Sequence, residues 1–488
     1  WDDCSSTVTY LCAVRPLLPT DDFVRYDNGQ GTRGDGREAR TAGPGTAHGP
    51  VTASAAESAE RARPDLQLSR KGRPPRNSVD TTLLLLVTVV AATFGPYLVG
   101  GVRADQLLVY AAAVPASFAA LYVRRPIFLR PVILAWLLLV LAVLVSTVTQ
   151  TGNIDRSFVP ARGIITGLDT VLFPLAIVLL VNMARPGSAA RALHGVLTTI
   201  VVLMTANAGL AVLQIASPSS VGWLTRWHTL GIATETVASR AAGLGRVGGV
   251  FNQPAEAGLA YGCALLAAIF LWRARGRLAV LPILLIFVGG TLTVSKVFLL
   301  GVAAAILLAL VIGRGVTRVL PLLLTLSAVV AVPLLSAVWS GASYWERYRD
   351  IPQEQWVKVF SSGRFGSESA LTETVSLITW HDPITGFGAA GVLRAYDNAW
   401  VEAYALGGVL AVAALTLFMA LAINVASSGR RSSLKAFFLA LTLMYCVACA
   451  GVPAFTANRA GLYYWVIMGL ILVGLRDQEA GGSPRRGA

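Results

Sequence analysis

Charged side chains are scarce in this chain. Asp, Glu, Lys and Arg together make up 14% of its 488 residues, whereas 55% of the residues are hydrophobic. A soluble domain has about 25% charged residues, so the composition excludes an ordinary soluble protein and indicates an integral membrane protein. The net charge of +14 does not indicate nucleic-acid binding, because the basic residues form short clusters between apolar runs, as membrane topology requires. We expect a lipid bilayer as a partner and no nucleic acid.

Cysteine, histidine and lysine are also few. The five cysteines have spacings that suit neither zinc nor a set of structural disulfides, and the four histidines form no cluster. We therefore expect no metal and no other cofactor. Arginine replaces lysine almost throughout, and together with the many alanines this bias is typical of a GC-rich bacterial genome. We expect a protein of the bacterial cytoplasmic membrane.

Long apolar runs fill most of the chain after residue 80, and a membrane-spanning helix needs about 20 apolar residues. Twelve such runs are present, at about 81–101, 105–123, 131–150, 164–184, 193–215, 255–272, 278–294, 297–313, 319–338, 400–426, 435–453 and 460–475. The sequence thus predicts an all-α polytopic membrane domain at 80–476. Eleven spans are the alternative, because only Ser295 and Lys296 separate the seventh and eighth runs. Residues 1–79, rich in Gly, Arg, Asp, Ser and Pro, are expected to be a disordered cytoplasmic extension or sequence upstream of the true start.

The basic residues predict which loops face the cytoplasm. With the N-terminus inside, the inner loops hold thirteen basic residues and no acidic ones, whereas the four short outer connections hold five basic residues. This asymmetry agrees with the positive-inside rule, so we expect both ends, including a tail at 477–488, to be cytoplasmic. Two long loops, at about 217–254 and 339–399, are then extracytoplasmic. Long loops in a compact bundle are usually functional.

The first long loop ends in RVGGVFNQPAEAG, which contains Arg246 and Glu256. Glycine lets the backbone approach a ligand closely, and an adjacent arginine can bind a phosphate with two hydrogen bonds. The alternative is a tight turn back into the membrane, with Arg246 anchored among the lipid headgroups. Lys296 follows in TVSKVFLL, between the seventh and eighth spans.

The second long loop contains three segments that bear on function. SYWERYRDIPQEQWVKVF is expected to lie in the membrane interface as a helix with an aromatic face. Arg364, in SGRFG, stands in the expected first turn of a helix. DPITGFG then predicts a turn into an irregular segment that contains Gly386 and Gly388. His381 directly precedes this segment, as a turn residue or as a candidate base.

Asp397 and Asn398 directly precede the tenth span, at the expected water boundary, and Gly408 follows ten residues after Asn398. Asp before a helix often accepts hydrogen bonds from its free N–H groups, so Asp397 could be a helix cap, a catalytic carboxylate or both. Irregular backbone is tolerated at membrane depth only where it lines a cavity or is buried in protein. We therefore expect the Asp-Asn pair to face a cavity.

The order of these motifs resembles the O-antigen ligase and O-antigen polymerase superfamily, membrane enzymes that join lipid-linked glycans outside the cytoplasmic membrane. The resemblance covers about residues 160–425. RVGGVFNQPAEAG matches the family's Arg-Gly-Phe-Pro segment, TVSKVFLL its Thr-x-Ser-Arg segment, SGRFG its Gly-Arg helix and DPITGFG its Pro-x-x-Gly-x-Gly turn. Two positions depart from the pattern: Lys296 stands where Arg is usual, and Asp397 replaces the His of a His-Asn pair. The acidic residue favours the polymerase branch.

The resemblance implies a glycosyltransferase of GT-C-like architecture, with a polyprenyl-diphosphate-linked glycan as donor and a glycan or lipid as acceptor. Arg246, Lys296 and Arg364 would neutralise the departing diphosphate, and Asp397 would take the acceptor proton or orient the acceptor. It also implies a reaction without metal or cofactor, and a chain-length regulator and a flippase as partners. The substrate contacts that it implies are at Asn398, Glu256, His381, Gly386 and Gly388.

A transporter is the alternative class, because twelve spans with both ends inside also describe many permeases. Such carriers often have related halves and a long central cytoplasmic loop. In this sequence the connection after the sixth span is only WRARGRL, and no matching half-repeats are evident. A flippase for lipid-linked glycans is the specific alternative, followed by a non-enzymatic partner in polysaccharide assembly.

Overall fold

The computed structural model divides the chain into two units, Trp1–Asp80 and Thr81–Ala488, and all described residues belong to the second. Described are residues 81–98, 102–120, 127–150, 164–184, 187–221, 223–224, 242, 246–275, 280–312, 321, 325, 370–389, 396–428 and 432–481. The predicted extension at 1–79, nearly all of the ninth span, the interface segment and Arg364 lie outside the described residues.

The described residues form helices and no strand. The longer helices are α3 (Thr81–Phe94), α4 (Ala104–Ala120), α5 (Pro131–Gln150), α6 (Ile164–Asn182), α7 (Ala189–Ala216), α10 (Pro254–Arg275), α11 (Val280–Leu292), α12 (Lys296–Ile312), α16 (Ala370–His381), α17 (Ala399–Ser427), α18 (Ser433–Ala448) and α19 (Asn458–Gly481). Each predicted span that falls on described residues coincides with one of them. The first ends earlier than predicted, at Phe94, because Pro96 disfavours helical backbone at the residue before it.

Five of these helices are long and apolar enough to cross a membrane: α5, α7, α17 and most of α10 and α19. Shorter apolar helices accompany them. The described part of the chain is therefore all-α and has helices of the membrane type, as the composition predicts. The number of spans and the extent of the two long loops stay predictions.

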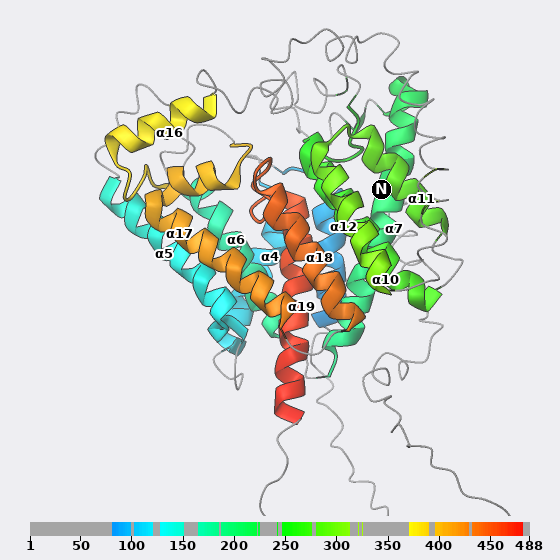
Figure 1. The fold of residues 1–488 in the computed structure, drawn as a ribbon, viewed down its shortest axis with the longest axis horizontal. Helices are drawn as coiled ribbons and strands as arrows, with labels where there is room; N and C mark the ends of the chain where they lie inside the picture. The colour runs from blue at the N-terminus through cyan, green and yellow to red at the C-terminus, as the bar shows by residue number, and fades with distance from the viewer. Residues whose placement is uncertain are drawn as a thin grey trace, which may run out of the picture. The chain divides into compact units, whose positions relative to one another are not determined.

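Helix α19 lies among α3, α6, α7 and α10, and every residue from Arg459 to Val473 is buried (Figure 1). Its Trp465 contacts Trp136 of α5, with ring centroids 4.7 Å apart, and Phe418 of α17, at 5.2 Å. Because lipid tails are as apolar as the helices, close packing of this kind holds membrane helices together. The aromatic cluster thus joins α5, α17 and α19.

Glycines bring α10 and α12 together. A Cβ added at Gly301 would lie 2.5 Å from the Cα of Gly262, and one added at Gly258 would lie 2.6 Å from the side chain of Ser295. Small residues of this kind let two helix backbones approach closely. They place the start of α12, including Lys296, against the first turns of α10.

Candidate functional site

The start of α17 is fixed by Asn398. Its Oδ1 accepts hydrogen bonds from the backbone N–H groups of Trp400 (2.9 Å) and Val401 (3.1 Å), and its Nδ2 donates to the carbonyl of Ala450 (3.2 Å). The interpretation of Asp397 as the helix cap is therefore wrong: Asn398 is the cap, because its extended backbone aims its side chain at the free N–H groups. Asn398 is buried, whereas Asp397 is exposed.

Helix α17 is broken at Gly407 and Gly408, whose backbone angles are not helical. The tenth span, predicted as one continuous helix, thus consists of two helical segments, 399–406 and 409–427, which Figure 1 shows running in different directions. The first segment begins at the Asp397–Asn398 pair. The break therefore separates the candidate site from the long apolar segment that follows.

Residues 382–388, the DPITGFG motif, insert into this break, and we call them the insertion turn. In an unbroken helix the N–H of Val409 would bond to the carbonyl of Ala405. Here Val409 donates to the carbonyl of Pro383 (2.9 Å), and Ala405 accepts from the N–H of Phe387 (2.8 Å). The turn thus supplies both partners that the break removes from the helical ladder.

Glycine is required where the insertion turn meets α17. Gly408 has a φ of +60°, and a Cβ there would lie 2.1 Å from the carbonyl oxygen of Ile384; Gly386, with a φ of +66°, would meet the carbonyl of Tyr404 at 2.5 Å. Gly388 has a φ of +69° and lies against the backbone of Thr147 in α5. These glycines have a structural explanation, and the substrate contacts that the resemblance implies at Gly386 and Gly388 stay predictions.

His381 is the last residue of α16, directly before the insertion turn. Its side chain is exposed, and its ring lies 5.9 Å from that of Phe387. It therefore belongs to the same group of contacts as the insertion turn and α17. The structure is compatible with both interpretations of His381, as a turn residue or as a base.

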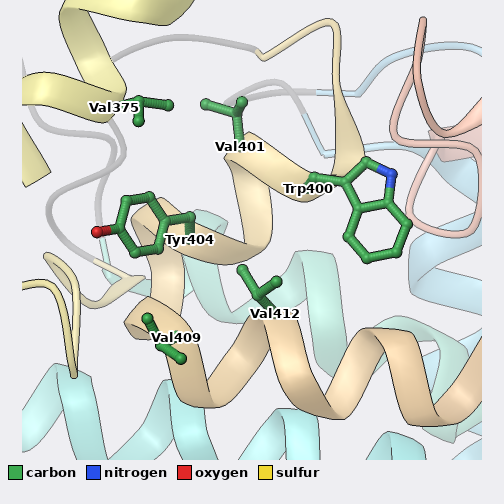
Figure 2. Close-up of a pocket in the computed structure, with 6 residues that line it drawn as sticks. All are labelled: Val375, Trp400, Val401, Tyr404, Val409 and Val412. Carbon is green, nitrogen blue, oxygen red and sulfur yellow. The ribbon is translucent and has the colours of Figure 1, made fainter. Parts of the chain in front are cut away.

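An apolar groove of about 300 Å³ lies between α16 and α17, and Figure 2 shows its lining. Val375 comes from α16, and the other side chains come from both segments of α17, so the groove extends across the break. Its lining residues are Val375, Trp400, Val401, Tyr404, Val409 and Val412. Trp400, the first lining residue of α17, comes three positions after the exposed carboxylate of Asp397, and the groove is almost wholly apolar.

Arg246 and Lys296 both lie at a different turn, the one between α11 and α12. The Nε of Arg246 donates a long hydrogen bond to the carbonyl of Thr293 (3.4 Å), and the N–H of Val247 donates to that of Leu292 (2.9 Å). Lys296 follows at the start of α12 and is exposed. The structure thus brings together the basic residues of two motifs that lie 50 positions apart in the sequence.

Glu256 lies in the first turn of α10 and is only 5% exposed. Its Oε1 accepts a hydrogen bond from the backbone N–H of Arg459 (2.6 Å). The guanidinium of Arg459, 1% exposed, donates to the carbonyls of Thr93 (2.9 Å), Val250 (3.0 Å) and Gly95 (3.2 Å). This placement favours a structural role for Glu256, at the junction of α3, α10 and α19, over the substrate contact that the resemblance implies.

Several polar side chains of this region were missed by sequence reasoning. Glu402, one turn after Asn398, accepts a hydrogen bond from the hydroxyl of Thr456 (2.7 Å) and lines a cavity of about 20 Å³, roughly the space that one water needs. Arg103 and Asp105 form a buried ion pair at 3.0 Å. A carboxylate within an apolar run is the signal that could have singled out Glu402, because such residues are often functional.

The described site residues thus form two groups of contacts. One contains His381, the insertion turn and the start of α17 with Asp397 and Asn398; the other contains Arg246 and Lys296 at the α11–α12 turn. Glu256 belongs to neither group, because its hydrogen bond is to the backbone of Arg459. Within the described ranges, no three His, Cys, Asp or Glu side chains converge as metal ligands. No protein-family model matches this chain, and no curated protein sequence matches it either.

Proposed function

We propose that this chain is a membrane glycosyltransferase similar to the O-antigen ligases and polymerases. It would join a glycan carried on polyprenyl diphosphate to a glycan acceptor, on the extracytoplasmic face of the bacterial cytoplasmic membrane. One observation carries the proposal: two of the motifs behind the resemblance, DPITGFG and the Asp397–Asn398 pair, meet at the same broken helix. Irregular backbone at membrane depth is tolerated only where it is buried in protein or lines a cavity, and a cavity beside an exposed carboxylate would suit a polar substrate.

The proposed reaction is a single displacement. The acceptor hydroxyl oxygen forms a bond to the anomeric carbon of the donor, the bond from that carbon to the diphosphate oxygen breaks, and its electron pair leaves with the diphosphate. The exposed carboxylate of Asp397 takes the acceptor proton. Arg246 and Lys296, together at the α11–α12 turn, are suited to bind the departing diphosphate. Arg364 is assigned to the same task by the resemblance alone.

The apolar groove of Figure 2 supports this donor class. Its valines and aromatic rings offer the branched, apolar surface that suits an isoprenoid chain, and each methylene removed from water contributes about 0.8 kcal/mol. The groove includes Trp400, three residues after Asp397. A chain held there would bring its diphosphate end to the region of the exposed carboxylate.

The topology belongs to the same proposal. Twelve spans with both ends in the cytoplasm would put the long loops at about 217–254 and 339–399 outside, as the distribution of basic residues predicts. The starts of α10, α12 and α17 would then face the outside together. A chain-length regulator and a flippase would be the protein partners.

The test uses purified protein in lipid vesicles with a fluorescent oligosaccharide on polyprenyl diphosphate and no added metal or nucleotide sugar. The proposal expects longer glycans on the lipid and release of polyprenyl diphosphate. Unchanged glycan length would contradict it. Movement of the intact lipid-linked glycan across the vesicle membrane, without elongation, would instead identify the flippase.

A further inference from the structure

The carboxylate of Asp382 accepts four hydrogen bonds at the start of the insertion turn. Its Oδ1 accepts hydrogen bonds from the backbone N–H groups of Ile384 (3.1 Å) and Thr385 (3.0 Å), and its Oδ2 accepts from the hydroxyl of Thr385 (2.6 Å). The Nε2 of Gln150 also donates to Oδ2. The Thr385 hydroxyl, followed by its backbone N–H, lowers the pKa of Asp382, so the group is ionised at neutral pH.

The last turn of α5 holds the insertion turn at both ends. At its start, Gln150 donates to Asp382 and also to the hydroxyl of Thr385 (3.0 Å). At its end, the hydroxyl of Thr147 accepts from the N–H of Ala389 (2.9 Å). The insertion turn is therefore tied to α5 by side chains and to α17 by backbone hydrogen bonds.

These contacts decide where the first segment of α17 points. The break at Gly407 and Gly408 removes the helical hydrogen bonds that would align residues 399–406 with the rest of α17. The direction of this segment is then set by the cap at Asn398, by the hydrogen bond between Thr456 and Glu402, and by the insertion turn. The carboxylate that holds the turn is therefore one of the groups that place the residues at the start of α17.

We propose that Asp382, with Gln150 as its partner, is a positioning residue for Asp397 in the glycan transfer. The expected change in the rate of glycan transfer rests on the proposed function, whereas the expected change in the position of the first segment of α17 does not. Asp382 does not contact the reacting atoms; it fixes the insertion turn, the turn fixes the first segment of α17, and that segment presents Asp397. Because a displacement of about 1 Å can cost a hundredfold in rate, loss of this anchor should reduce kcat.

The central variant is Asp382→Asn. It keeps the size of the side chain, but its amide N–H₂ group cannot accept the hydrogen bonds that Oδ2 accepts from the Thr385 hydroxyl and from Gln150. Combining it with Gln150→Glu exchanges carboxylate and amide across the same contact and restores a donor–acceptor pair. Glu373→Gln is the matched control, because it removes an exposed carboxylate from the first turn of α16, nine positions before the insertion turn begins.

Two measurements are made on each variant. The first is steady-state kinetics of glycan transfer. The second needs no activity: it is the rate at which a cysteine at Val401, in a background free of native cysteines, reacts with a maleimide. Val401 lies in the first segment of α17 and lines the groove against Val375 (Figure 2), so the rate reports movement of that segment away from α16.

For Asp382→Asn we expect kcat to fall at least about tenfold and labelling at position 401 to accelerate about tenfold. The KM for a short-chain donor, which does not need the groove, should stay within about twofold. The double variant should recover both the kcat and the labelling rate of the wild type, and Glu373→Gln should resemble the wild type in both measurements. If Asp382→Asn does not fold, Thr385→Val, which removes one hydroxyl of the same contact, should give smaller changes in the same directions.

Unchanged labelling in Asp382→Asn, or a double variant no better than the single one, would overturn the positioning role. A wild-type protein without transfer activity would contradict the proposed function, and the labelling rates would still decide whether Asp382 holds the first segment of α17. The two failures are therefore distinguishable.

Discussion

The backbone N–H of Phe387 donates a hydrogen bond to the carbonyl of Ala405, 2.8 Å away, at the place where an unbroken helix would offer the N–H of Val409. A loop and a helix that lie 18 positions apart in the sequence thus share one hydrogen-bond ladder. Consequently, a substitution that dislodges the insertion turn should also disturb α17, and one that closes the break should expel the turn.

Gly408→Ala tests this dependence. Its φ of +60° is strained for a residue with a side chain, and the added Cβ would lie 2.1 Å from the carbonyl oxygen of Ile384. Strain of this kind costs about 1–3 kcal/mol before the clash is counted, so the thermal unfolding midpoint of the purified protein should fall by several degrees.

The matched control is Gly209→Ala, within α7, where nothing lies within 4 Å of the added Cβ. Alanine favours a helix over glycine by about 1 kcal/mol, so the thermal unfolding midpoint of Gly209→Ala should equal or exceed that of the wild type. Equal midpoints for the two variants would show that the insertion turn does not constrain Gly408.

The fold was predictable from the sequence where an apolar run of sufficient length dictated a helix. The run at 131–150, for example, is α5, because its residues satisfy their backbone hydrogen bonds only within the helix. The glycines at 386 and 388 also indicated irregular backbone, whereas the break at Gly408 was not predicted.

The insertion of the turn into α17 was not predictable, because nothing local shows that Pro383 and Phe387 meet a helix about 20 positions later. Asp397 and Asn398 are both good cap residues, and only the backbone angles of Asn398 decide between them. The pairing of Glu256 with Arg459 joins positions 203 residues apart, which neither spacing nor periodicity encodes.

The sidedness of the proposed site is tested by cysteine labelling in intact cells. Cysteines at Ser219, which is exposed, and at Ser361 should react with an impermeant thiol reagent. A cysteine at Ser428 should not, since it precedes the basic residues predicted to be cytoplasmic. The position 432 nearby is avoided because the hydroxyl of Ser432 caps α18, and a cysteine there would remove the cap. Labelling of Ser428 with protection of Ser219 would invert the topology.

Arg246→Ala should lower glycan transfer by about a hundredfold, the cost of losing about 3 kcal/mol of charge stabilisation. The protein should remain folded, because the hydrogen bond that Arg246 donates to the carbonyl of Thr293 is long, at 3.4 Å. Arg364→Ala should behave alike. Arg191→Ala, exposed at the start of α7, is the control and should retain activity. Near-normal rates for Arg246→Ala would show that this arginine only anchors its loop.

The groove is tested with Val412→Trp, which fills part of it. The KM for a donor with a long isoprenoid chain should rise about tenfold or more, whereas the KM for a short-chain donor should change little, because only the long chain needs the occupied volume. Leu417→Trp, on an exposed face of α17 outside the groove, is the control. Equal effects on both donors would exclude the groove as the chain's binding site.

Conversion of a purified lipid-linked repeat unit into longer chains, by the wild type and by Asp397→Asn, tests the central claim most directly. Because Asn398 is the cap, this substitution leaves the start of α17 intact and removes only the carboxylate. The wild type should elongate the glycan without metal or nucleotide sugar, Asp397→Asn should be about a hundredfold slower, and Asp397→His should keep partial activity, since imidazole is a competent base near neutral pH. No elongation by the wild type, or an Asn variant at full rate, would contradict the account.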